Sequence, residues 1–157
     1  CAALMLEGWR LLSDEMCLVD LDSGEIVPFV RPISLKNQSL YLVQKWYAAA
    51  QVRQITTGTT KGTVGFLLPT DLSWQAYKRT AKPAWIVFPQ FNAEIAELQL
   101  SAMSKADAFM HLANNAFNYA VLAEQGFKSL GRLMQEVNAY RLEYADIDQA
   151  IAELSLL

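Results

Sequence analysis

The chain has 157 residues and a formal net charge of −3, and 53% of its residues are hydrophobic while 18% are charged. This length fits one domain with a core of its own, and the composition excludes an intrinsically disordered chain. The acidic balance excludes a general nucleic-acid binder, which needs clustered positive charge, and no apolar run approaches the ~20 residues that span a bilayer.

The first seven residues have the pattern of an apolar helix, and Gly8 follows at the position that commonly ends one. This pattern starts without a polar residue that could cap the helix, and Cys1 stands in place of an initiator methionine. We therefore expect the chain to be part of a longer protein whose helix begins upstream.

The pattern of residues 9–83 predicts mainly short strands. Apolar runs at 16–19 and 25–30, joined by the turn residues 20–24, predict a β-hairpin. The further predicted elements of this half are a strand in residues 9–15, a helix at 40–50, strands at 52–57 and 63–68 around a flexible connection at 58–62, and a loop with one helical turn at 71–83.

Helical patterns become frequent after residue 104. Ser104 and Asp107 match a capping box, and Gly126 is expected to break the helical run that follows. The other predicted elements are strands at 84–88 (closed by Pro89), 94–100 and 140–144, and helices at 127–137 and after the cap Asp146. The sequence therefore predicts an α/β fold, a mixed sheet with flanking helices, in a single domain over residues 1–157.

The most informative local pattern is the apolar run that ends in Asp14 and Glu15. Many nucleotide-binding α/β folds place a carboxylate at the end of a buried strand, near the Mg²⁺ that accompanies a phosphate. The alternative is an ordinary strand end whose acids are only solvated.

Three cations lie in polar or turn segments beside apolar runs, namely Arg31, Lys36 and Lys61. A cation in such a position can contact phosphate. Each of them taken singly can also be a solvated loop charge.

The single histidine and the two cysteines carry less information. His111 lies within a predicted helix, where a packed or solvated role is the simple interpretation. Cys17 lies in an apolar run without a Cys or His at metal-binding spacing, which favours structural burial. Two cysteines make no disulfide framework, so a reducing, cytoplasmic setting is expected.

Five segments taken in order resemble the HPr serine kinase-related proteins, the relatives of the catalytic domain of bacterial HPr kinase/phosphorylase. The segments are GWRLLSDE at 8–15, RPISLKN at 31–37, TKGTV at 60–64, WIVFP at 85–89 and NAFNY at 115–119. The branch they resemble most is the HprK-related kinase A group. The resemblance covers nearly the whole chain.

The resemblance implies a nucleotide-binding core like that of phosphoenolpyruvate carboxykinase. Residues 1–7 would be the end of the P-loop helix and residues 9–15 the acid-bearing strand. Asp14 matches the acid that acts on the seryl hydroxyl near the metal, and Glu15 stands where the kinase has a second acid, usually Asp. Residues 31–37 match a segment that normally holds Mg²⁺ through a Glu, but this chain has no Glu there.

Three functions follow from these residues. The first is an ATP- and Mg²⁺-dependent serine kinase of a small protein or peptide, with Asp14 as base and metal ligand, Glu15 as second metal ligand, and Arg31, Lys36 or Lys61 offsetting phosphate charge. The second is a non-catalytic binding or scaffold module with the same fold. The third is an inactive piece of the kinase, because the P-loop is absent from these residues. HPr kinases are hexameric, so the resemblance favours a homo-oligomer.

Overall fold

The computed structural model describes all 157 residues, and it divides them between two compact units. Unit 1 contains residues 1–18 and 26–80, and unit 2 contains residues 19–25 and 81–157. The α/β class predicted from the sequence is confirmed, with antiparallel and mixed sheets and flanking helices. The single kinase-like domain stays a prediction, because two such units can together form one domain.

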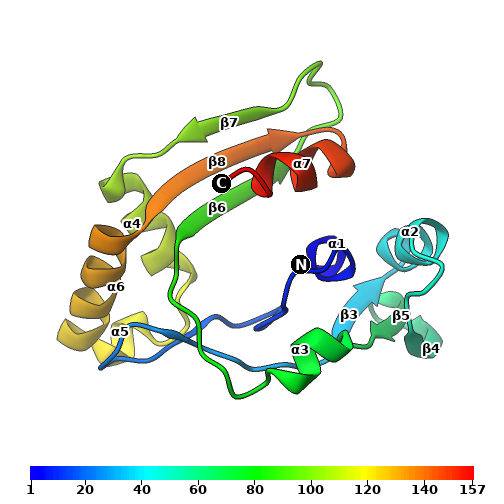
Figure 1. Ribbon diagram of the computed structural model, residues 1–157, viewed down its shortest axis with the longest axis horizontal. Coiled ribbons are helices and arrows are strands. Elements are labelled where there is room, and N and C mark those ends of the chain that lie inside the picture. The colour runs from blue at the N-terminus through cyan, green and yellow to red at the C-terminus, as the bar shows by residue number, and fades with distance from the viewer. The chain divides into compact units, whose positions relative to one another are not determined.

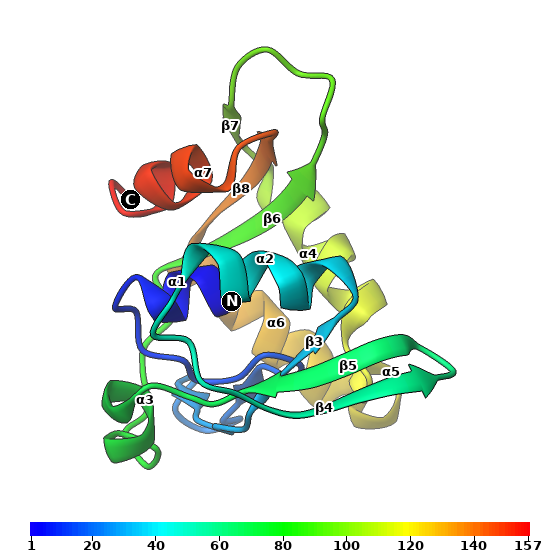
Figure 2. The same ribbon diagram turned by 90° about the vertical axis from the view of Figure 1, so that its right-hand side faces the viewer.

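Unit 1 is built around a three-stranded antiparallel sheet. The strands are β3 (Ile33–Lys36), β4 (Val52–Thr59) and β5 (Gly62–Leu67), in the order β3-β5-β4. The helices are α1 (Ala2–Leu6), α2 (Gln38–Trp46) and α3 (Asp71–Gln75). Figure 2 shows β4 and β5 as one long hairpin. The core of the unit consists of Met5, Leu11, Ile33, Leu35, Leu40, Val43 and Leu67.

The start of unit 1 confirms the helix expected before Gly8. The amide of Gly8 donates to the carbonyl of Met5, and the amide of Trp9 donates to that of Leu4. These two bonds form a Schellman motif, in which the residue after the helix takes a positive φ. Gly8 has φ +95, a value that residues with a side chain rarely adopt.

The hairpin predicted around residues 20–24 is also confirmed. Strands β1 (Leu18–Val19) and β2 (Ile26–Val27) pair as a two-stranded sheet. The carboxylate of Asp20 fixes the turn, since it accepts hydrogen bonds from the backbone and the hydroxyl of Ser23 at 2.7 and 2.8 Å. Such bonds between a side chain and its own turn are typical of Asp.

Unit 2 holds a mixed sheet. Its strands are β6 (Trp85–Phe91), β7 (Gln99–Ala102) and β8 (Asn138–Tyr144), in the order β6-β8-β7, with β6 parallel and β7 antiparallel to β8 (Figure 1). Its helices are α4 (Lys105–Asn115), α5 (Tyr119–Leu122), α6 (Glu124–Glu136) and α7 (Ile147–Leu154). Ala108, Met134, Val137 and Ala139 form its buried cluster between α4, α6 and the sheet.

Three expected boundaries in unit 2 are wrong. Gly126 lies buried inside α6, and the helical run is instead broken at Ala123, which has φ +46. A Cβ at Gly126 would lie 3.0 Å from the carbonyl oxygen of Tyr119, so this glycine permits close packing of α5 on α6. Strand β6 also continues through Pro89, because an edge strand can lack one amide donor. The predicted strand at 94–100 lies slightly later, as β7.

Candidate functional site

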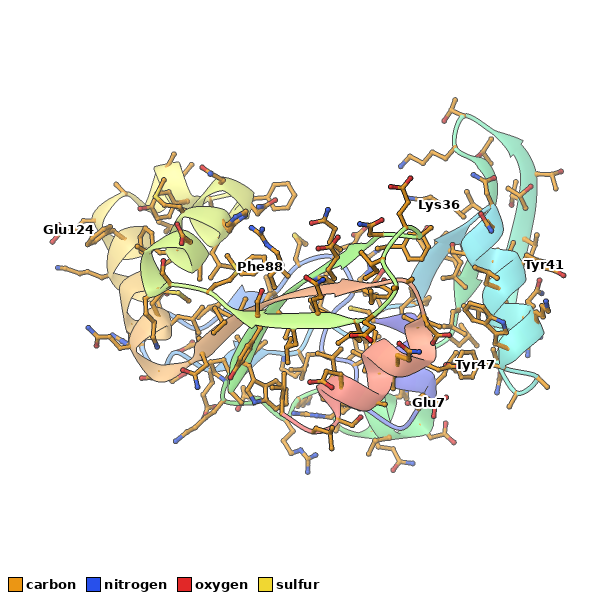
Figure 3. All side chains as sticks on the ribbon, turned by 90° about the horizontal axis from the view of Figure 1, so that it is seen from above. Glu7, Lys36, Tyr41, Tyr47, Phe88 and Glu124 are labelled. Carbon is orange, nitrogen blue, oxygen red and sulfur yellow. The ribbon has the colours of Figure 1, made fainter.

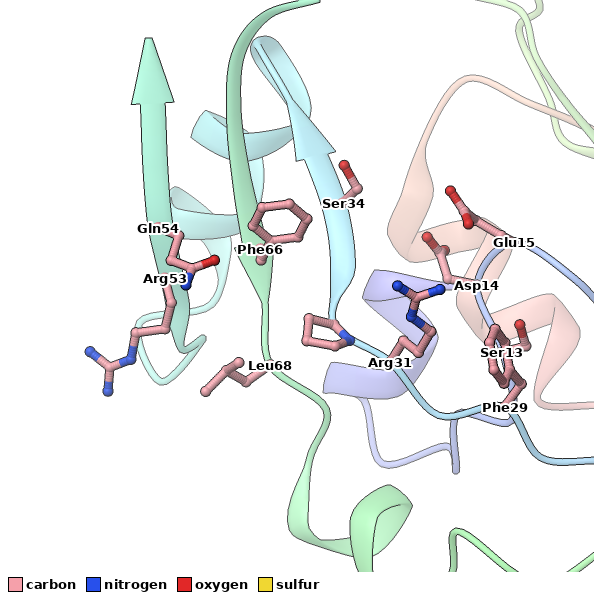
Figure 4. A pocket seen from close by; sticks show the side chains of 11 residues that line it. Ser13, Asp14, Glu15, Phe29, Arg31, Ser34, Arg53, Gln54, Phe66 and Leu68 are labelled. Carbon is pink, nitrogen blue, oxygen red and sulfur yellow. The ribbon is translucent and has the colours of Figure 1, made fainter. Parts of the chain in front are cut away.

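Unit 1 contains a cavity of about 490 Å³ beside its sheet. Its volume falls in the range of about 300–1,000 Å³ that is usual for small-molecule sites. The wall combines charged, hydroxyl and aromatic side chains from four parts of the unit (Figure 4). The residues are Ser13, Asp14, Glu15, Phe29, Arg31, Pro32, Ser34, Arg53, Gln54, Phe66 and Leu68.

The acids stand on an irregular segment that no sheet incorporates. The predicted strand at 9–15 is wrong, because the structure gives these residues no strand assignment. The amide of Leu11 donates to the Oγ of Ser73 at 2.9 Å, and the carbonyl of Leu12 accepts from Phe29 at 2.8 Å. Side-chain and single backbone bonds therefore replace a strand ladder. Leu11 is buried, so the segment is anchored just before the acids.

Asp14 and Glu15 present exposed carboxylates at the edge of the cavity. Neither carboxylate takes part in a hydrogen bond or an ion pair with another side chain. Before them, the hydroxyl of Ser13 accepts from the amide of Met16 at 3.2 Å, which closes a short turn around the two acids. The N-terminal ammonium of Cys1 interacts electrostatically with Asp14, but it forms no ion pair within 4.0 Å, so an external cation can still approach both carboxylates.

Arg31 brings a positive charge to the same cavity from the segment between β2 and β3. Its guanidinium lies 5.3 Å from the ring centre of Phe29, a cation–π contact that holds the side chain. Figure 4 shows Arg31 extending toward Asp14. No ion pair within 4.0 Å joins the two, so the guanidinium keeps its donors for another partner.

The opposite wall was missed by the sequence analysis. Arg53 and Phe66 are cross-strand partners on β4 and β5, and a register irregularity follows between Arg53 and Thr56. Gln54 lies inside this irregularity with φ +51. Figure 4 shows the Arg53 guanidinium directed away from the acids. The only signal for this wall was a charged and an amide residue inside a β-branched run, which alone does not indicate a site.

Lys36 and Lys61 do not line the cavity. Lys36 ends β3, and Lys61 lies in the turn between β4 and β5 (Figure 3 labels Lys36). Asn37 connects the two segments, because its amide donates to the carbonyl of Lys61 at 3.2 Å and its carbonyl oxygen accepts from Thr63 at 3.0 Å. Of the five predicted site residues, the structure therefore gathers Asp14, Glu15 and Arg31 at one place and Lys36 and Lys61 at another.

The prediction that Cys17 is structurally buried is wrong, because the residue is exposed. Partial burial of its thiol nevertheless removes water from around it, and this desolvation raises the pKa of Cys17. A raised pKa keeps the thiol protonated and poorly nucleophilic at neutral pH. Cys17 is therefore no candidate nucleophile.

The donor set at the cavity suits a hard cation only in part. Mg²⁺ in phosphate-binding sites is commonly held by one or two carboxylates, with phosphate oxygens and water completing its shell. Asp14 and Glu15 can provide those carboxylates. No group of three or more His, Cys, Asp or Glu side chains that could hold a metal ion occurs in the structure.

Comparisons with known proteins give no further guide to this site. No protein-family model, curated protein or solved structure matches the chain. None of the helices has both the length and the apolar character needed to cross a membrane. The cavity and the sequence resemblance are therefore what support a function for this chain.

Proposed function

We propose that unit 1 carries a phosphoryl-transfer site that moves phosphate from ATP to a serine of a small protein or peptide. The observation that supports this proposal most is the meeting of Asp14, Glu15 and Arg31 on one cavity. A nucleotide with its Mg²⁺ presents both a cation and anionic phosphates, so a site of free carboxylates and a free guanidinium matches both parts. A simple anion would instead be repelled by two carboxylates.

In this proposal Asp14 accepts the proton of the seryl hydroxyl. Its carboxylate is exposed and takes part in no hydrogen bond or ion pair, so a substrate hydroxyl can reach it. Arg31 offsets the charge on the transferred phosphate through its unused donors. Asp14 and Glu15 would hold Mg²⁺, which neutralises phosphate charge when bound. Phe66 and Leu68 offer an apolar wall that suits a nucleobase.

Lys36 and Lys61 have a secondary place in this proposal. Neither lines the cavity, so either would contact phosphate only through a longer ligand that extends past the sheet. We therefore expect Lys36→Ala to weaken nucleotide binding less than Arg31→Ala does. A cytoplasmic location and a homo-oligomer remain part of the proposal through the resemblance alone.

The alternative is a non-catalytic binding module. Residues 31–37 contain no Glu, although the resembling kinases hold Mg²⁺ through a Glu in this segment. A module of this kind would use the same cavity to bind a ligand without transferring phosphate. Transfer of phosphate to a serine separates the two functions, because a binding module would bind its ligand without this transfer.

The first experiment measures divalent-cation binding by the 157-residue chain. Mn²⁺ should broaden the NMR signals of residues 13–15 and 31 selectively, because paramagnetic broadening falls steeply with distance. Asp14→Asn should remove this broadening while the spectrum elsewhere stays unchanged. Asp22→Asn is the matched control, since Asp22 is an exposed acid in unit 2. Equal broadening in Asp14→Asn and in the unsubstituted chain would remove Asp14 as a metal ligand.

The second experiment measures the transfer of phosphate from ATP to a serine-containing peptide by the full-length protein. Asp14→Asn should lower the rate about 10²–10⁴-fold, because the amide neither accepts the proton nor attracts the cation as a carboxylate does. The 157 residues alone should bind ATP·Mg²⁺ weakly or not at all, because they contain no P-loop. Unchanged turnover in the Asp14→Asn variant would favour the binding module.

A further inference from the structure

Unit 2 has a polar cleft of its own, of about 400 Å³, at the junction of β7, β8 and α4. Its wall is composed of Ser101, Ala102, Met103, Ser104, Asp107, His111 and Arg141. Every one of these residues belongs to unit 2, so the cleft is separate from the cavity with Asp14. The proposed function does not use it.

The sheet places Arg141 in the wall of the cleft, with an exposed side chain. In the register of the three strands, Arg141 of β8 is the direct partner of Phe88 on β6 and of Ser101 on β7. Direct cross-strand partners project from the same face of a sheet. Ala139, two residues before Arg141, projects from that face as well and packs in the buried cluster with Ala108 of α4. Helix α4 therefore covers the face from which Arg141 projects.

Helix α4 places Asp107 and His111 in the wall of the same cleft. The two residues are four positions apart, which puts them on one side of the helix. The His111 ring lies 5.2 Å from the ring of Phe88, the strand neighbour of Arg141 (Figure 3 labels Phe88). The histidine is therefore held above the row of Phe88, Arg141 and Ser101.

The carboxylate of Asp107 is fixed before any ligand arrives. The hydroxyl of Ser104 donates to its Oδ2 at 2.7 Å, while the amide of Asp107 donates to the Oγ of Ser104 at 3.1 Å. This reciprocal pair holds the Asp107 side chain at the start of α4 and leaves Oδ1 available. A fixed acceptor costs little conformational entropy when it binds.

The guanidinium of Arg141 has no partner within the chain. It takes part in no hydrogen bond or ion pair, although a carboxylate lines the same cleft. Its donors suit a carboxylate, which an arginine can bind with two parallel hydrogen bonds. The cleft thus offers one free cation and one fixed anion, with two serine hydroxyls between strand and helix.

We propose that this cleft binds a free amino acid, or a similar small zwitterion, with its carboxylate on Arg141 and its ammonium on Asp107. A dianion such as phosphate would bind the guanidinium of Arg141 but would be repelled by the carboxylate of Asp107. A simple amine would bind the carboxylate of Asp107 but would be repelled by the guanidinium of Arg141. A ligand that carries both charges is repelled by neither side chain. His111, which also lines the cleft, would then contact the ligand's own side chain.

The test is a titration of the chain with L-alanine, followed by ¹H–¹⁵N NMR. Saturable shifts are expected at Ser101, Asp107 and the Nε of Arg141, and not at residues 13–15 of unit 1. Acetate, methylamine and inorganic phosphate, each at matched ionic strength, should give weaker shifts at the same residues. Phosphate binding as tight as L-alanine would overturn the proposal in favour of a plain anion site.

Variants of the two charged residues complete the test. Arg141→Gln and Asp107→Asn should each weaken L-alanine binding about tenfold to a hundredfold, the loss expected for one charge-assisted hydrogen bond. Arg79→Gln and Asp148→Asn remove the same charges elsewhere and should leave binding unchanged. Where Arg141→Gln fails to fold, Arg141→Lys keeps the charge but loses the paired bonds, and it should also bind more weakly. Unchanged binding in these Arg141 and Asp107 variants, or no saturable shift with L-alanine, would overturn the proposal.

Discussion

The two units build three-stranded sheets from different parts of the chain. In unit 1, β4 and β5 follow each other directly, and β3 precedes them by a single helix. In unit 2, β6 pairs with β8, which follows only after β7 and three helices. Unit 1 is thus organised by near neighbours and unit 2 by a long crossover. The two units also differ in their cores, in their helix caps and in their cavities.

The cores predict the largest difference between the units. In unit 1, the side chain of Leu67 is 0% exposed and packs in a cluster of large aliphatic residues. In unit 2, Met134 is the largest member of a buried cluster that includes two alanines. Leu67→Ala and Met134→Ala should each cost about 2–5 kcal/mol of unfolding free energy, with Leu67→Ala the larger because a flexible methionine site can readjust more readily. Chemical denaturation measures the free energy of unfolding of each variant.

Hydrogen exchange then shows where each loss is felt. Leu67→Ala should lower amide protection in β3, β4 and β5, and Met134→Ala should lower it in β6, β8 and α4. Equal loss of protection in both sheets by either variant would show that the units unfold as one cooperative body, which would remove the distinction between them.

A buried hydroxyl predicts the next largest effect, and it lies in unit 1. The Oγ of Ser73 accepts the amide of Leu11, and Ser73 is 0% exposed. Ser73→Ala should cost about 1–3 kcal/mol, because the buried amide would lose its only acceptor. Ser129→Ala in α6 is the control, since the Ser129 side chain makes no hydrogen bond. Similar stabilities for the two variants would show that water replaces the Ser73 hydroxyl.

Helix caps distinguish the units in a third way. None of the helices of unit 1 has a side-chain cap, whereas Ser104 caps α4 and Asp146 caps α7 in unit 2. Ser104→Ala and Asp146→Ala should each cost about 1 kcal/mol. Asn118 begins α5 without a side-chain bond, so Asn118→Ala should change stability little. Thermal unfolding compares the three, and an equal loss in all of them would contradict a role for the cap bonds.

The smallest predicted effect depends on pH and concerns the turn at Asp20. This turn belongs to unit 2, although it lies in the sequence between the two segments of unit 1. Hydrogen bonds from Ser23 lower the pKa of Asp20. Because the folded pKa lies below the unfolded one, the stabilisation is complete above the unfolded pKa and is lost as the pH falls through the folded pKa. In Ser23→Ala the pKa of Asp20 should rise only part of the way toward its ordinary value, because the hydroxyl bond is lost while the bond from the backbone amide of residue 23, the larger cause, remains. A ¹³C carboxyl titration by NMR measures this shift, and an unchanged pKa would contradict a contribution from the Ser23 hydroxyl.

Local patterns predicted the elements well where a single physical signal decides them. The cap Ser104, the Asp20 turn and the strands that became β4 and β5 were all found from neighbouring residues. The failures share another cause. Residues 9–15 are apolar enough for a strand, but their backbone bonds to Ser73 and Phe29, and no local pattern reveals partners so far away in the sequence.

The candidate site was predictable to a similar degree. Asp14, Glu15 and Arg31 drew attention because each is a charge beside an apolar run, and they share the cavity. Arg53 and Gln54 were missed because their place depends on the register irregularity of β4, which arises only when β4 pairs with β5. The cleft of Arg141 was missed for the same reason, since strand register, not sequence, places Arg141 beside Ser101.

The parallel pairing of β6 with β8 has a consequence for synthesis on the ribosome. Strand β6 leaves the exit tunnel with its apolar residues Trp85, Ile86, Val87 and Phe88 and waits for β8 until β7 and three helices have followed. During that interval its backbone edge has no partner, which is the condition under which strands join other chains. Pro89 removes one amide donor from this waiting edge. The nascent chain is therefore most open to chaperone capture or aggregation between the emergence of β6 and that of β8.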